Sequence, residues 1–192
     1  LQDVDISVRR GDIHALLGEN GAGKSTLVKI LDGIYPSGTY SGDMSVDGTP
    51  VRFHSPHDAR GKGIGYVPQE ISVFEDMSVA ENLFVGNWTE GSGRLVNFKS
   101  LHKRAEQLLD EYGITLDARI PVSSLSASQR QMVMIARALA TQPSVLILDE
   151  ATACLTTDET RRLFAVVKRL QQRGVTCIFI THRMAEIFEL AD

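Results

Sequence analysis

The chain has 192 residues, a net charge of −4 and 43% hydrophobic residues. This length and composition predict one ordinary globular domain. The acidic balance argues against a nucleic-acid-binding surface that covers the whole domain. The longest apolar runs, such as 163–167, have five residues, whereas a membrane-spanning helix needs roughly 18.

Residues 4–8 alternate apolar and polar side chains, which predicts a strand, and a turn at 10–12 leads to a second strand over 13–17. The pattern over 185–190 predicts a helix. Because the chain starts just before a strand and stops directly after a helix, we expect it to be a piece of a longer chain. Cys154 and Cys177 have no ligand-like spacing, so we expect both to be buried and reduced.

A glycine-rich segment at 18–26 matches the pattern G-x-x-x-x-G-K-[ST], between the apolar strand and a helical run that ends at Asp32 and Gly33. This setting is typical of a loop that cradles phosphate with its backbone N–H groups. Lys24 would reach the β- and γ-phosphates, and the Ser25 hydroxyl would hold Mg²⁺. Kinases, GTPases and motors share such a loop. The predicted nucleotide-binding residues are Gly18, Glu19, Asn20, Gly21, Ala22, Gly23, Lys24, Ser25 and Thr26.

A continuous apolar run at 145–148 predicts a strand that is buried on both faces, as in a parallel sheet. It ends in two adjacent carboxylates, which are costly to bury unless they serve a cation or a proton. We expect Asp149 to orient the Mg²⁺ shell and Glu150 to act as general base towards water.

Two segments have the capping-box pattern that opens a helix. Ser126 and Gln129 precede an apolar helical run over 132–139, so a free helix end suited to a phosphate is expected there. Thr156 and Glu159 precede a second helix that ends near 174, to which we assign packing only.

In chain order, the phosphate loop, Gln69, the 125–129 segment, the acidic pair and His182 resemble the ATPase domain of ABC transporters. The resemblance covers essentially the whole chain. The sequence is similar to the ATPases of monosaccharide importers of the ribose, xylose and galactose type in four segments, at 18–26, 35–40, 153–156 and 181–188. Those chains usually fuse two such domains, and the intact phosphate loop resembles the first copy.

The resemblance implies an α/β P-loop NTPase fold: a mostly parallel sheet flanked by helices, with an inserted helical subdomain. The core subdomain would cover about 1–70 and 142–192, and the helical subdomain about 71–141. The implied catalytic residues are Glu150, His182, Gln69 and Lys24. The implied Mg²⁺ ligands are Ser25, Gln69 and Asp149. The residues implied to contact the ATP held by an opposite domain are Ser126, Ala127, Ser128 and Gln129.

The family's activity would be ATP hydrolysis that energises import of a monosaccharide, with ATP and Mg²⁺ as cofactors. The implied partners are a second ABC ATPase domain in the same or a fused chain, transmembrane permease subunits and, indirectly, an extracytoplasmic sugar-binding protein, but no nucleic acid. The implied location is the cytoplasmic face of the bacterial plasma membrane, where the protein would be peripheral.

Two glycines of the usual L-S-G-G-Q signature are replaced here by Ala127 and Ser128. A Cβ atom can crowd a close backbone approach, whereas the serine offers another hydroxyl. One alternative is therefore a regulatory nucleotide-binding domain that hydrolyses poorly. Another is an ABC ATPase of DNA repair or translation, which the acidic balance disfavours. A small-molecule kinase would need neither this signature nor His182.

Overall fold

The computed structural model describes residues 1–19, 21–88 and 95–190, and its contacts divide the chain into two compact units. The first unit contains Leu1–Gln69, Thr141–Ala151 and Val167–Asp192. The second contains Glu70–Ala140 and Thr152–Val166. The sequence predicts the helical subdomain over about 71–141, whereas the second unit also contains Thr152–Val166.

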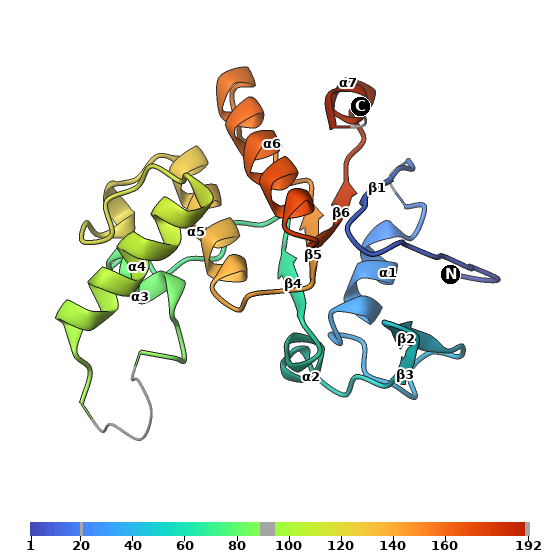
Figure 1. Ribbon diagram of the computed structural model, residues 1–192. Helices are drawn as coiled ribbons and strands as arrows, with labels where there is room; N and C mark the ends of the chain where they lie inside the picture. Colours follow the sequence, from blue (N-terminus) through green and yellow to red (C-terminus); the bar gives the residue numbers. More distant parts are fainter. Residues whose placement is uncertain (20, 89–94, 191–192) are drawn as a thin grey trace. The chain divides into compact units, whose positions relative to one another are not determined.

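A four-stranded parallel sheet forms the centre of the first unit, in the order β1-β6-β5-β4 (Figure 1). Its strands are β1 (Ile13–Leu16), β4 (Ile64–Val67), β5 (Val145–Asp149) and β6 (Thr176–Ile180). All strands run in the same direction, so their carboxyl ends lie at one edge. The predicted α/β class with a parallel sheet and flanking helices is confirmed.

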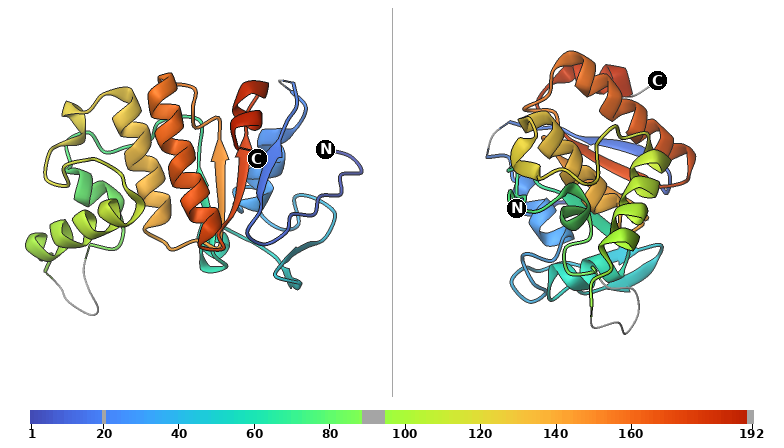
Figure 2. Two further views of the ribbon diagram at one scale, coloured as in Figure 1. Left: turned by 45° about the horizontal axis from the view of Figure 1, so that its top comes forward. Right: turned by 90° about the vertical axis from the view of Figure 1, so that its left-hand side faces the viewer.

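Two helices and a hairpin of the first unit share a buried apolar cluster with this sheet. These elements are α1 (Lys24–Leu31), β2 (Met44–Val46), β3 (Thr49–Val51) and α2 (Pro56–Gly61). Helix α7 (Met184–Leu190) follows β6. Val28 of α1 is fully buried in a cluster with Ile147 and Ile178 of the central strands. The antiparallel β2–β3 hairpin forms a separate two-stranded sheet (Figure 2).

The second unit is helical. Its elements are α3 (Val79–Leu83), α4 (Phe98–Tyr112), the short 3₁₀-helix η1 (Val122–Ser124), α5 (Ala127–Leu139) and the first part of α6 (Thr157–Gln172). Leu101, Ala105 and Leu109 recur at helical spacing on α4 and are buried. Leu163 and Val166 do the same on α6. Apolar periodicity therefore positions these helices.

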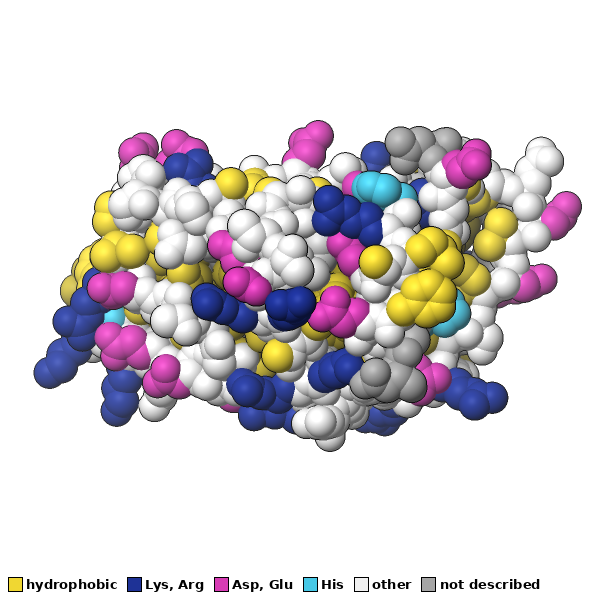
Figure 3. Space-filling view, turned by 90° about the horizontal axis from the view of Figure 1, so that it is seen from above, with side chains coloured by type: hydrophobic (Ala, Val, Ile, Leu, Met, Phe, Trp, Pro, Cys, Tyr) yellow, Lys and Arg dark blue, Asp and Glu magenta, His cyan; other side chains and the backbone are white. Residues whose placement is uncertain are grey.

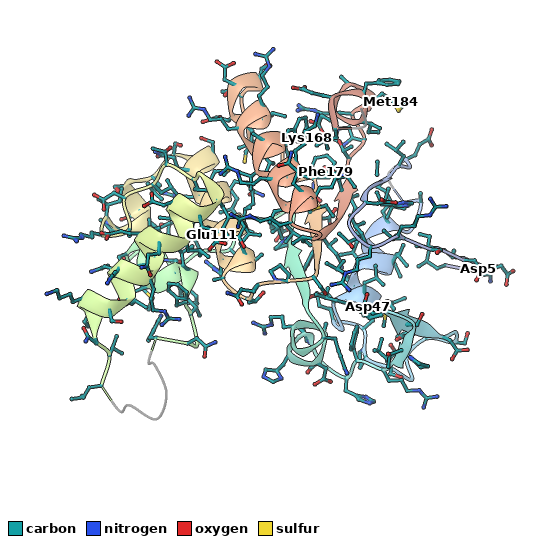
Figure 4. The ribbon with its side chains drawn as sticks, viewed as in Figure 1. Asp5, Asp47, Glu111, Lys168, Phe179 and Met184 are labelled. Atoms are coloured by element: carbon teal, nitrogen blue, oxygen red, sulfur yellow. The ribbon has the colours of Figure 1, made fainter. Side chains whose placement is uncertain are left out.

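Two predictions are wrong. Residues 4–8 form no strand: Val4 and Ile6 are 48% and 46% exposed, and Asp5 lies on an extended segment away from the sheet (Figure 4). Alternation is not enough, because a strand needs a neighbour to pair with. Cys154 is exposed, whereas Cys177 is buried as expected. Cys154 lies in the turn segment that follows β5, whereas Cys177 is a residue of the fully buried strand β6.

The surface carries charges of both signs. On the face shown in Figure 3, basic and acidic side chains are interspersed rather than gathered in large patches of one sign. In the parts of the chain that the structure describes, no helix has the length and apolar character needed to cross a bilayer.

Candidate phosphate-binding and catalytic site

The loop between β1 and α1 presents backbone N–H groups at the start of a helix. Gly21 and Gly23 have φ angles of 86° and 92°, which side chains with a Cβ rarely adopt. Gly23 is the N-cap and provides no side-chain cap. The first N–H groups of α1 therefore have no acceptor within the helix, and they suit an anion. Asn20, also predicted for this loop, lies outside the described residues.

Lys24 reaches back across this loop. Its Nζ donates to the carbonyl oxygens of Gly18 at 2.6 Å and of Glu19 at 3.0 Å. These bonds hold the ammonium group over the concave side of the loop. Phosphate oxygens are stronger acceptors than neutral carbonyls, so the same ammonium group can bind a phosphate placed there.

The acidic pair ends β5. Asp149 is 5% exposed and its Oδ2 accepts a hydrogen bond from the Tyr66 hydroxyl at 3.3 Å. Burial raises the pKa of the Asp149 carboxyl, and the Tyr66 bond opposes this rise. Glu150 has a φ of 47° and donates its N–H to the Ile180 carbonyl at 3.0 Å. Such a backbone angle is strained for a residue other than glycine, and strain of this kind often marks a functional position.

Two residues from separate loops meet at the Glu150 carboxylate. The Gln69 amide donates to Glu150 Oε2 at 3.1 Å, and His182 Nδ1 lies 3.3 Å from Glu150 Oε1. Both carboxylate oxygens therefore have a partner, and the Glu150 side chain is only 15% exposed. The loops after β4 and β6 hold this carboxylate in one orientation.

The phosphate loop and the Glu150 cluster line one hollow of about 570 Å³ in the first unit. Among the predicted residues, Gly18 and Ala22 belong to the loop but do not line the hollow. The lining residues are Glu19, Gly21, Gly23, Lys24, Ser25, Thr26, Gln69, Asp149, Glu150 and His182.

The 126–129 segment opens α5 in the second unit. Ser126 Oγ accepts from the Gln129 N–H at 3.3 Å, and Gln129 Oε1 accepts from the Ser126 N–H at 3.0 Å, so the predicted capping box is confirmed. Ser126, Ala127 and Gln129 are exposed, but Ser128 is only 8% exposed. Its hydroxyl is not free, because it donates to Glu159 Oε1 at 2.6 Å.

Sequence reasoning missed two residues that bond to the predicted site residues. Tyr66 lies three positions before Gln69, and the pairing of β4 with β5 brings its hydroxyl to Asp149. Glu159 makes its predicted capping bonds to Thr156, and it also receives the Ser128 hydroxyl. Neither long-range contact has a signal in local spacing.

Comparison with known proteins identifies the family. The sequence pattern described as "ABC transporter" matches residues 1–153. The chain belongs to the ABC transporter family. It is 43% identical over its full length to the xylose import ATP-binding protein XylG of Geobacillus kaustophilus, and 46% identical to the ribose import ATP-binding protein RbsA 1 of Burkholderia thailandensis. It spans 38% of the length of each of these relatives.

A solved structure supports the same assignment. The crystal structure of a nucleotide-free ATP-binding cassette from an ABC transporter superposes with a TM-score of 0.82 at 25% identity. The match covers 96% of this chain and 76% of that chain. The resemblance to the ATPase domains of sugar importers, drawn from the motifs, is confirmed.

Proposed function

We propose that this chain is an ATP-hydrolysing domain that powers import of a monosaccharide. The observation that carries the proposal is the convergence of Gln69 and His182 on Glu150, in the same hollow as the phosphate loop. A loop that binds a triphosphate and an oriented carboxylate beside it are the two parts that hydrolysis requires. The names of the relatives support sugar import as the process that hydrolysis drives.

In the proposed reaction, Lys24 and the start of α1 bind the phosphates of ATP. Glu150 accepts a proton from water as the water oxygen bonds to the γ-phosphorus. The bond from this phosphorus to the bridging oxygen breaks, and ADP leaves with the electron pair. Each Glu150 oxygen has one partner and a further lone pair that can accept from water. Gln69 and His182 orient this carboxylate beside the phosphate loop.

Ser25, Gln69 and Asp149 would hold Mg²⁺. All three offer oxygen donors, which Mg²⁺ prefers. Within the described residues, no cluster of three or more His, Cys, Asp or Glu side chains could hold a metal. Mg²⁺ in phosphate sites usually takes one or two carboxylates and completes its shell with phosphate and water, so a single buried Asp fits. When bound, Mg²⁺ offsets charge on the phosphates.

The pairing partner in this proposal is a second ABC ATPase domain, in another copy or elsewhere in the longer chain. Its ATP would meet the residues of the signature, which are Ser126, Ala127, Ser128 and Gln129. Closure of the pair would move permease subunits at the cytoplasmic face of the bacterial plasma membrane, to which a sugar-binding protein delivers its cargo. The import names of the relatives, and the 38% of their length that this chain spans, support such an assembly.

A second candidate is a regulatory domain that binds ATP but hydrolyses it poorly. The replacement of two signature glycines by Ala127 and Ser128 favours it, because an added Cβ can hold a phosphate away from the backbone.

The test combines turnover and solution mass. We expect the unchanged protein to hydrolyse ATP, and the Glu150→Gln variant to double in mass with MgATP in light scattering. Lys24→Ala, the control, should lose both ATP binding and doubling. If the unchanged protein binds ATP in a separate assay but releases no phosphate, the hydrolase proposal fails and the regulatory candidate replaces it. Turnover without doubling would show that hydrolysis does not need pairing between copies of this chain.

A further inference from the structure

A chain of side chains connects the start of α5 to the start of α6 within the second unit. Ser126 Oγ lies 2.9 Å from Ser128 Oγ, and Ser128 Oγ donates to Glu159 Oε1 at 2.6 Å. The other carboxylate oxygen of Glu159 accepts from the N–H and the hydroxyl of Thr156, each at 2.9 Å. Both oxygens of Glu159 are therefore in use.

The chemistry of these groups sets the direction of every bond. Hydrogen bonds from Ser128 and from Thr156 lower the pKa of the Glu159 carboxyl, so it is an ionised group that only accepts. Ser128 has one hydroxyl proton, and it points to Glu159. The bond between the two serines must then be donated by Ser126. Ser126 Oγ also accepts from the Gln129 N–H.

This direction of bonding turns the Ser128 side chain inward. Ser128 is 8% exposed, while its neighbours Ala127 and Gln129 are exposed. The side chain that replaces a signature glycine is thereby drawn towards Glu159 and away from the exposed start of α5. The Ser126 hydroxyl meanwhile lies against a neutral oxygen, a weaker acceptor than a phosphate. A phosphate that binds at this helix end can accept the hydrogen bond from the Ser126 hydroxyl in place of the Ser128 oxygen.

We propose that Ser128 and Glu159 are positioning residues that orient the Ser126 hydroxyl and the first turn of α5 for a phosphate of ATP. The inference rests on the proposed function, in which the 126–129 segment contacts the ATP of a partner domain. Under this inference, Ser128 can replace the signature glycine as long as Glu159 accepts its hydroxyl hydrogen bond.

The second unit contains a matched control for the capping role of Glu159. Glu81 caps α3 in the same way, with Oε2 accepting from the N–H of Ser78 at 2.9 Å and from its hydroxyl at 2.6 Å. Glutamine also serves at this position of a capping box. Glu81→Gln and Glu159→Gln therefore change the same kind of cap, but only the second also changes the acceptor of Ser128.

The experiment is steady-state ATP hydrolysis by the unchanged protein and five variants. Ser128→Ala and Glu159→Gln should each lower kcat about tenfold. Half-saturating ATP should stay within about twofold, because the phosphate loop is intact. The double variant should lose about tenfold and not about a hundredfold, since both changes break one chain of bonds. Ser128→Thr keeps the hydroxyl and should recover to within about threefold of the unchanged protein. Glu81→Gln should match the unchanged protein.

Three results would overturn the inference: an unchanged kcat in Ser128→Ala, equal losses in the two glutamine variants, or losses that multiply in the double variant. Should Ser128→Ala fail to fold by circular dichroism, the comparison of Glu159→Gln with Glu81→Gln still decides. Full turnover by Ser128→Ala would refute the positioning role alone. No turnover by the unchanged protein would refute the proposed function and this inference with it.

Discussion

Replacing Gly33 with alanine would test the tight turn that follows α1, the helix that opens at the phosphate loop. Gly33 has a φ of 74°. A Cβ there would lie 2.5 Å from the Ser55 carbonyl oxygen and 2.8 Å from its carbon. Both are backbone atoms at the N-cap of α2, so they cannot turn aside as a side chain can. Alanine at this position must shift one segment against the other.

Gly48, in the turn of the β2–β3 hairpin, isolates this clash. Its φ is 72°, and an added Cβ would meet no atom within 4 Å. Alanine in the left-handed region destabilises the fold by about 1–2 kcal/mol. Because alanine also lowers the entropy of the unfolded chain, about 0.4–1 kcal/mol of this loss is offset. These two terms apply to both glycines. A forced backbone shift adds about 1–3 kcal/mol, and only at Gly33.

Urea unfolding followed by circular dichroism would measure both variants. Because both glycines belong to the first unit, the same transition reports them. We expect Gly33→Ala to lower the free energy of unfolding by about 2 kcal/mol more than Gly48→Ala does. The m value, the slope of this free energy against urea concentration, should be the same in both variants. Equal losses in the two variants would refute the argument, because the contact with Ser55 would then cost nothing.

Burial raises the pKa of the Asp32 carboxyl from 3.8 to about 6, so the folded protein binds the extra proton and stability should fall as pH rises from about 4 to above 6. Asp32→Asn should remove most of this fall, about 2 kcal/mol at pH 8, and parallel pH profiles for both proteins would contradict it. Tyr66→Phe removes the hydroxyl bonded to Asp149 and should raise the Mg²⁺ needed for half-maximal turnover a few-fold, with ATP saturation unchanged; an unaltered Mg²⁺ requirement would count against this positioning. Cys154 is exposed and Cys177 buried, so a thiol reagent should titrate one thiol in the folded protein and two in urea, and two fast thiols before unfolding would disprove the burial.

Local chemistry is the part that sequence reasoning recovered. The glycine-rich loop needs only its own residues and the helix that follows, and a capping box such as that of Ser126 and Gln129 needs residues three positions apart. Continuous apolar runs likewise indicated buried parallel strands, and β5 is one. Alternation over 4–8 did not produce a strand, because alternation cannot identify the neighbour that a strand must pair with.

The sequence by itself determined the phosphate loop, the helix caps, the acidic pair after a buried strand and the family. Only the tertiary structure decided which of these groups touch. Gln69 and Glu150 are 81 positions apart, Glu150 and His182 are 32 apart, and Ser128 and Glu159 are 31 apart. The strand order β1-β6-β5-β4 brings Gln69, Glu150 and His182 to one edge of the sheet. Each apolar strand offers similar faces to any neighbour, so this order follows from the packing of the whole unit.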